Sequence, residues 1–479
     1  MIEEYISKIK NDIEKKEIEK DESLYKKEIN LKYMTKKAGD QDIFGYKFVK
    51  NNANNVSLII NGEKSELVQE HYLKQGENNI TLCINNTLTD LSHMFNFCKT
   101  LYNIDELKYL NTKNVTDFSF MFRYCKISNI TVLENWNTSK SENFCFMFSN
   151  CKLITNIKPL KNWIVSRCKD FSAMFEFCNI TDIKPLECWD VSNGTNFKEI
   201  FKCTLISDIK PLEKWNISNA IDLGAFFEGC KSLSDISPLK NWNILKCENL
   251  TDLFAFCIEL TDISPLKNWN ISNVKNLSDL FCGCKNLTDI SAIQNWNTLK
   301  CEKMRSLFSR CTYLSDITPI KNWNVSNIKE LSGLFSECTY LSDITPIRNW
   351  DVSNVIDFSF IFHECSNIKD ISPLENWNVS KGLNFTQMLA GCGFSNLNPI
   401  KNWNVAKGED FSYMFYMCSF LSDIKAIEKW NVSNGNNFTR MFSGCNSLIN
   451  KNILKKWKIA GNIDFNSMFE ELSDFEKTL

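Results

Sequence analysis

Residues 260–284 read LTDISPLKNWNISNVKNLSDLFCGC, and residues 285–311 continue with KNLTDISAIQNWNTLKCEKMRSLFSRC. The second stretch repeats the pattern of the first after 27 residues, so that Trp296 takes the position of Trp269. A pattern that returns at a fixed distance of this size is typical of a solenoid. In such a fold no repeat buries its apolar side alone, and stacked repeats share one core.

The period extends over most of the chain. The phenylalanine at position 281 recurs every 26 or 27 residues from Phe95 to Phe469, with one leucine in the series. The cysteine at position 284 recurs with the same phase, and fourteen of the 21 cysteines belong to that column. Phe281, Cys284 and the tryptophans are therefore expected to form continuous columns in the core.

Within one copy the apolar spacing changes. From Cys257 to Trp269 apolar residues recur every three positions, which favours a short strand with corners around residues 260–266. Residues 273–281 carry apolar side chains three, three and one positions apart, which indicates one face of a short helix, with Ser272 placed to cap it. The sequence predicts an α/β solenoid whose coils each hold a short parallel strand and a short helix.

Four segments follow from this pattern. Residues 1–30 alternate acidic residues with lysine and predict a charged helical segment. Residues 31–87 predict a small β-rich cap, residues 88–469 a solenoid of about 14 repeats, and residues 470–479 a short acidic tail.

Within the predicted cap the apolar stretches are separated by polar turn sequences. The pair Asn61-Gly62 indicates a hairpin. The stretch IFGYKFV at 43–49 is expected to be one of the strands.

Composition and motifs weigh against several classes of function. The formal net charge is −2, whereas a nucleic-acid-binding chain should be clearly basic. The chain shows no phosphate-binding loop, no dinucleotide-binding motif and no HExxH, and its three histidines fall in different elements. We therefore expect no enzymatic activity, no cofactor and no metal.

The compartment follows from what the sequence lacks. It has neither a secretory signal nor an apolar run long enough to span a membrane. These absences favour a cytoplasmic protein, which we expect to be a monomer. Cysteines spaced once per repeat in such a chain favour buried, reduced thiols over disulfides or a zinc site.

Two polar columns each allow two interpretations. Asparagines such as Asn270 flank the tryptophans and either satisfy backbone groups at a bend or serve as glycosylation sites. The aspartates before the isoleucine of each copy either cap turns or form an acidic strip for a basic partner. Residues of this kind, together with lysines next to the prolines, give a candidate binding face: Lys158, Lys184, Lys210, Asp235, Asp262, Asp289, Asp316 and Asp343.

Three stretches resemble a known repeat family: TDFSFMFRYC at 116–125, LSDITPIRNWDVSNVIDFSFIF at 341–362 and NWNVSKGLNFTQML at 376–389. They are similar to the BspA-like leucine-rich repeats of bacterial and protist proteins, and the match covers residues 88–469. The resemblance implies a right-handed leucine-rich solenoid, roles in adhesion or protein binding, and no catalysis. Many proteins of that family are exported to the surface, whereas this sequence shows no signal.

The leading hypothesis is a non-catalytic scaffold that binds other proteins. A surface adhesin that binds host or extracellular proteins is the alternative. An enzyme or a nucleic-acid-binding protein with an unrecognised site is a third reading, against which the balanced charge and the missing motifs weigh.

Overall fold

The computed structural model describes residues 25–449, 451–457, 459 and 465–469. The predicted acidic tail at 470–479, and all but the last six residues of the predicted segment 1–30, lie outside them. The chain divides into two compact units, Met1–Ile217 and Ser218–Leu479, and each is described by itself.

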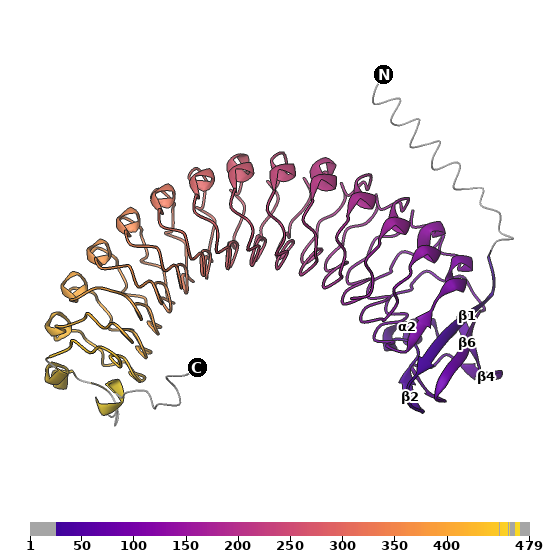
Figure 1. The fold of residues 1–479 in the computed structure, drawn as a ribbon, viewed down its shortest axis with the longest axis horizontal. Coiled ribbons are helices and arrows are strands. Elements are labelled where there is room, and N and C mark those ends of the chain that lie inside the picture. The colour runs from indigo at the N-terminus through magenta and orange to yellow at the C-terminus, as the bar shows by residue number, and fades with distance from the viewer. Residues whose placement is uncertain (1–24, 450, 458, 460–464, 470–479) are drawn as a thin grey trace, which may run out of the picture. The chain divides into compact units, whose positions relative to one another are not determined.

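The first unit begins with a β-rich module (Figure 1). Its strands and helix are β1 (Glu28–Thr35), β2 (Gly39–Asp42), α2 (Tyr46–Asn52), β3 (Val56–Ile60), β4 (Glu63–Glu66), β5 (Glu70–Leu73) and β6 (Gly76–Ile84). The larger sheet has the order β4-β3-β6-β1-β7, in which β7 (Leu101–Asn103) comes from the first repeat. The smaller sheet pairs β2 with β5. All these pairings are antiparallel.

The predicted hairpin at Asn61-Gly62 is present. β3 and β4 pair from Ile60 with Glu63, which leaves a two-residue turn. Asn61 has φ 50° and Gly62 has φ 95°. Two positive φ values in succession are what a type I′ turn requires, and this turn matches the twist of the strands.

The prediction of a strand at 43–49 is wrong, because α2 occupies most of that stretch. Phe44, just before the N-cap residue Gly45, packs on Phe48 in the first turn of α2 with ring centroids 5.7 Å apart, which fixes the entry of the chain into the helix. Gly45 ends the extended segment. Its N–H donates to Met94 O at 3.0 Å, and an added Cβ would lie 2.0 Å from His93 O.

The module packs on the first repeat of its unit. β1 pairs with β7, the N–H of Met34 donates to Thr100 O at 2.8 Å, and the rings of Phe44 and Phe95 lie 5.7 Å apart. The exposed end of a repeat array needs such a cover, because its outer coil has no neighbour to bury it.

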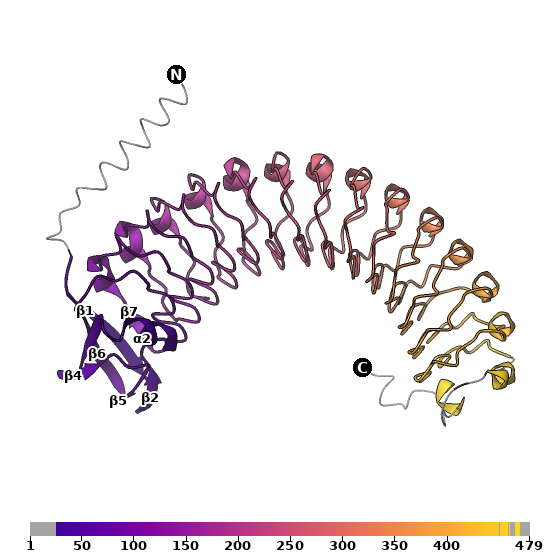
Figure 2. The same cartoon turned by 180° about the vertical axis from the view of Figure 1, so that it is seen from behind.

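Each following coil carries a short 3₁₀ helix at the same position, and the last coil carries a second one. In the first unit these are η2 (Asp105–Tyr109), η3 (Thr131–Asn135), η4 (Lys158–Leu160), η5 (Lys184–Leu186) and η6 (Lys210–Lys214). In the second unit they are η7 (Ser237–Leu239), η8 (Ser264–Asn268), η9 (Ser291–Ile293), η10 (Thr318–Ile320), η11 (Thr345–Ile347), η12 (Ser372–Leu374), η13 (Asn398–Ile400), η14 (Lys425–Ile427), η15 (Lys451–Lys456) and η16 (Phe465–Met468). Figure 2 shows the helices of neighbouring coils in the second unit following one another along one edge.

The structure corrects where strand and helix were expected within a coil. The predicted strand at 260–266 contains the start of η8 instead, because Pro265 fixes φ near helical values and has no N–H for a ladder. The predicted helix at 273–281 is absent, because Asp279 has φ 57° and so lies in the left-handed region, where a right-handed helix cannot continue. In the described part of the chain, parallel pairing occurs as isolated bridges, such as Asn276 with Lys303, and no strand forms at these bridges.

A regular hydrogen-bond pattern replaces that helix. Between the bridge residue and the cysteine of each coil, alternate N–H groups donate to the next coil, and we call this stretch the ladder segment. In residues 276–284 the N–H groups of positions 277, 279, 281 and 283 donate to carbonyls of the next coil at 2.7–3.1 Å. The N–H groups of positions 280, 282 and 284 donate three residues back within the coil. Every backbone donor from 279 to 284 therefore has a partner.

The core columns are tied to the preceding coil by polar atoms as well as by packing. Phe281 stacks on phenylalanines of both neighbouring coils, with centroids 6.0 Å apart on each side. The indole Nε1 of Trp269 donates to Leu239 O at 3.1 Å, and that of Trp296 to Leu266 O at 3.4 Å. The Sγ of Cys284 donates to Phe254 O at 3.1 Å. The indole and thiol donors thus add a second hydrogen bond to carbonyls, such as Leu239 O and Phe254 O, that already accept a turn N–H within their own coil.

The buried thiols of the cysteine column should be inert in the folded chain. Cys188 is exposed, whereas all the column cysteines except Cys203 are buried, and burial raises the pKa of thiols such as Cys311 well above its usual range. The reactive thiolate is therefore suppressed in the folded protein at pH 8. With a thiol reagent at this pH we expect Cys188 to react rapidly, and all 21 cysteines to react once the protein is unfolded.

The Cys188→Ser variant is the control and should lose the rapid phase alone. A persistent rapid phase of several thiols in that variant would contradict the buried column. A total far below 21 in denaturant without reductant would show disulfides instead.

Candidate functional site

The candidate face predicted from sequence lies beside the 3₁₀ helices. In the first unit Lys158, Lys184 and Lys210 are the first residues of η4, η5 and η6, and all three are exposed. In the second unit each aspartate of the face lies two residues before a 3₁₀ helix and is exposed: Asp235, Asp262, Asp289, Asp316 and Asp343. Each unit therefore presents its part of the face along one column.

The aspartates of this column hold the backbone. Asp262 Oδ1 accepts the N–H of Ser264 at 2.7 Å, and its Oδ2 accepts the Ser264 hydroxyl at 3.0 Å. The carboxylates of Asp235, Asp289, Asp316 and Asp343 accept the equivalent N–H at 2.7–2.8 Å. Hydrogen bonds from Thr345 also lower the pKa of Asp343. These contacts support the turn-capping interpretation, and an additional role as an acidic strip stays a prediction.

The asparagines after the tryptophans hold a second turn. Asn270 Oδ1 accepts the N–H of Ser272 at 3.1 Å, and Asn324 Oδ1 accepts that of Ser326 at 3.0 Å. The prediction that Ser272 caps a helix is therefore wrong. Its N–H instead donates to Asn270 Oδ1 and closes an Asx turn. The geometry supports the structural interpretation of these amides. It does not test glycosylation.

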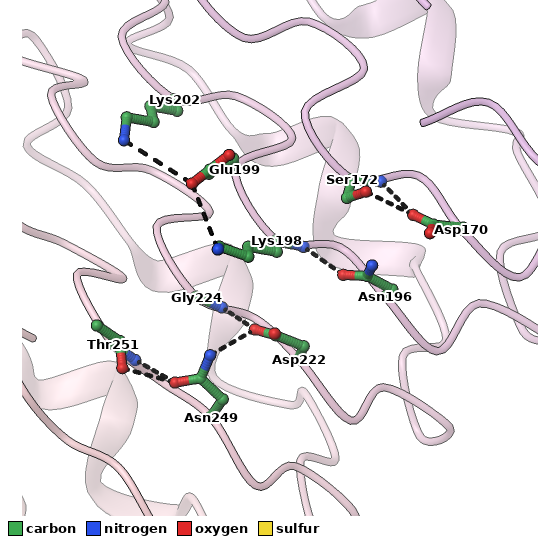
Figure 3. A network of polar contacts seen from close by, with 10 residues as sticks. All are labelled: Asp170, Ser172, Asn196, Lys198, Glu199, Lys202, Asp222, Gly224, Asn249 and Thr251. Carbon is green, nitrogen blue, oxygen red and sulfur yellow. Dashed lines mark hydrogen bonds and ion pairs between the residues drawn. The ribbon is translucent and has the colours of Figure 1, made fainter. Parts of the chain in front are cut away.

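A third Asx turn begins the ladder segment (Figure 3). In the first unit Asp170 Oδ1 accepts the N–H and the hydroxyl of Ser172 at 2.9 and 2.6 Å. In the second unit Asn249 Oδ1 accepts both groups of Thr251 at 3.1 and 2.6 Å, and its Nδ2 donates to Asp222 of the preceding coil at 2.9 Å. Three Asx turns per coil thus fix where the chain changes direction.

The ladder segment also presents a second surface, which we call the ladder face. Each ladder segment has two residues with positive φ. The ladder face consists of the side chains of these two residues and of the residue directly before the second one. At 120, 123 and 124 these are Phe, Arg and Tyr, all half-buried, while Met121 and Phe122 between them are buried. The buried positions repeat the same residue types from coil to coil, whereas the ladder-face positions change.

In the first unit the ladder face carries a group of aromatic rings around one arginine. We call Phe97, Phe120, Arg123, Tyr124 and Phe146 the Arg123 cluster. Phe97 stacks on Tyr124 and Phe120 on Phe146, with centroids 4.7 Å apart in both pairs. The guanidinium carbon of Arg123 lies 4.9–5.6 Å from the centroids of all four rings. Cation–π attraction therefore holds the arginine among the rings.

In the second unit the ladder face is hollowed. A depression of about 720 Å³ is lined by small and polar residues, including Ser306, Gly333 and Ser336. Its arginines are paired, since Arg305 lies 3.3 Å from Asp279 and Arg310 lies 3.0 Å from Glu337. The depression exists because residues without large side chains stand where the first unit has rings.

Sequence reasoning missed the ladder face. The face predicted from sequence lies next to the prolines, whereas the ladder-face positions lie between the repeated phenylalanine and cysteine. In FRYC at 122–125 the two central residues are half-buried and the two outer ones are buried. The sequence does show that the two residues between the repeated phenylalanine and cysteine vary from coil to coil. It does not show that they point outward, because this follows from the left-handed backbone conformation. Among the described residues no group of three or more potential metal ligands comes together.

Comparison with known families gives a result for most of the chain. A family model described as "Mycoplasma protein of unknown function, DUF285" matches residues 89–207, 196–318, 256–371, 304–426 and 359–479. The chain belongs to this family. The overlapping matches cover every coil, which agrees with the repeat solenoid. No curated protein matches the chain. No helix in the described part of the chain is long and apolar enough to cross a membrane.

The turn-capping role of the aspartates can be separated from their charge. Asp262→Ala should lower the free energy of unfolding by about 1 kcal/mol, because an N–H at the start of η8 loses its acceptor. Asp262→Asn should be close to neutral, because the amide oxygen can accept the same hydrogen bond. Urea unfolding followed by tryptophan fluorescence measures both.

The control is Lys267→Ala, an exposed change in the same turn, which should have no effect. If Asp262→Asn lowers the free energy of unfolding as much as Asp262→Ala does, the charge of the aspartate matters rather than its hydrogen bond in the turn.

Proposed function

We propose that this chain is a non-catalytic scaffold that binds other proteins through its ladder face. One observation carries the proposal: the core columns repeat, while the outward positions of the ladder segments differ from coil to coil. A fixed backbone with changing surface residues is how repeat proteins build a specific binding surface.

The composition of the ladder face in the first unit supports this role. Aromatic residues and arginine are the types that contribute most to protein–protein binding. The side chain of Phe97 is 39% exposed, and the other members of the Arg123 cluster are half-buried. Rings that are already stacked lose little conformational entropy when a partner covers them.

The lysine and aspartate column beside the 3₁₀ helices is the second candidate surface. Its carboxylates are engaged in capping, which leaves its lysines as the more available groups. The hypothesis that this column binds the partner is kept as the competing outcome of the test below.

We also infer that the repeats are of the BspA-like leucine-rich type and that the protein acts as a cytoplasmic monomer. The thiols of the core column donate hydrogen bonds to carbonyls, which supports a reducing compartment.

Proximity labelling in the source cell tests the binding surface. Full-length protein fused to a biotin ligase is compared with two variants, Phe97→Ala/Tyr124→Ala on the ladder face and Lys158→Ala/Lys184→Ala/Lys210→Ala on the column. We expect the first variant to lose its main labelled partners at least about five-fold, because large contact side chains are removed. The second should keep them.

Circular dichroism and thermal unfolding confirm that both variants are folded. Loss of partners by the column variant alone would assign binding to the face predicted from sequence. If both folded variants label the same proteins as the parent, the ladder face of the first unit is not the binding surface.

A further inference from the structure

Among the residues that the structure describes, none accepts a hydrogen bond from the Arg123 guanidinium. Its Nε is buried without a hydrogen-bond partner among the described residues. No hydrogen bond or ion pair joins the Arg123 side chain to any described residue, and the groups that contact its guanidinium are the faces of four rings. Ring faces attract a cation but do not accept the planar set of N–H bonds that a guanidinium offers.

Glu176 is a carboxylate whose pKa Arg123 influences, but it is hydrogen-bonded to another residue. Its Oε2 accepts the hydroxyl of Ser149 at 2.6 Å. Burial raises the pKa of Glu176, and the influence of Arg123 on it is minor. Two other arginines of ladder segments, by contrast, have carboxylate partners: Arg305 pairs with Asp279 and Arg310 with Glu337. Arg123 is thus held in place by rings while its donors stay open.

We propose that the Arg123 cluster is the anchor for a partner segment that carries one carboxylate next to apolar side chains. The inference rests on the proposed protein-binding role of the ladder face. A carboxylate accepts two parallel N–H bonds from a guanidinium, which is the strongest pairing available to Arg123. The apolar neighbours of that carboxylate cover Phe97 and Tyr124.

The same surroundings disfavour a nucleic acid, although stacked rings with an arginine also suit unpaired bases. Such a ligand needs a track of positive charge for its phosphates. Here charges of both signs border the cluster: burial lowers the pKa of His93 first, Lys47 lowers it further, and Asp117 and Asp90 act in the opposite direction. His93 itself stacks on Phe120 at 4.4 Å. Two cations, Arg123 and Lys47, beside two acids form no continuous positive track, which suits one carboxylate and not a chain of phosphates.

Fluorescence anisotropy with defined peptides tests the anchor. The probe is a labelled nonapeptide with one glutamate between leucine and phenylalanine in a glycine–serine frame, and its partner peptide has glutamine instead. We expect full-length protein to bind the glutamate peptide about five-fold more tightly, because a charged acceptor strengthens the bond to a guanidinium. Arg123→Met should bring the two affinities within two-fold of each other.

Two further variants sharpen the result. Arg310→Met removes a ladder-face arginine that already has a partner, and it should keep the preference of the parent protein. Phe97→Ala should weaken both peptides while the ratio between them stays. Near-UV circular dichroism confirms that the variants are folded.

Equal binding of the two peptides, or no binding of either, would overturn the anchor. A labelled oligothymidylate could also bind more tightly than either peptide and lose this binding in Arg123→Met. That result would assign the Arg123 cluster to single-stranded nucleic acid and would also overturn the carboxylate anchor. If the peptide preference is absent while the ladder-face variant still loses its labelled partners in cells, protein binding stands and only the carboxylate anchor falls.

Discussion

The structure of each unit depends on one backbone arrangement, the alternation of hydrogen bonds in the ladder segments. Alternate N–H groups bond to the next coil, and those between them close turns within their own coil. This alternation requires two residues with positive φ per coil, such as Phe120 and Tyr124. Each costs about 1 kcal/mol when it is not glycine. A coil on its own has only the cost, whereas a stacked coil also has the bonds to its neighbour.

The remaining contacts follow from that stacking. Because the ladder fixes one coil against the next, equivalent residues meet their counterparts, and phenylalanines, tryptophans and cysteines form columns. The Trp269 and Cys284 side chains donate into the preceding coil, to carbonyls that already accept a turn N–H there. The Asx turns at Asp262, Asn270 and Asn249 bend the chain where these columns need it. Stability is therefore shared between neighbours rather than held within a repeat.

The sequence predicted the period, the solenoid and the identity of the core columns, since these depend on apolar residues at fixed distances. It did not predict the local backbone. The stretch NVKNLSDLF has helical spacing, yet Asp279 is left-handed, and nothing in an aspartate at that position indicates this. The segment DISPL has strand-like spacing, but Pro265 makes it the start of a 3₁₀ helix. The ladder face was missed for the same reason, because the direction of Arg123 and Tyr124 follows from left-handed backbone that the pattern of letters does not encode.

The equivalence of the ladder segments has a consequence for how such chains change in length. If one whole period is removed or duplicated, each remaining donor still finds an acceptor of the same kind in its new neighbour, and each ring finds another ring. A gain of one or three residues inside a ladder segment breaks this match, because donors that pointed to the next coil then point into their own. Proteins built in this way can be lengthened or shortened by complete coils, and their surfaces reassorted, without a new fold.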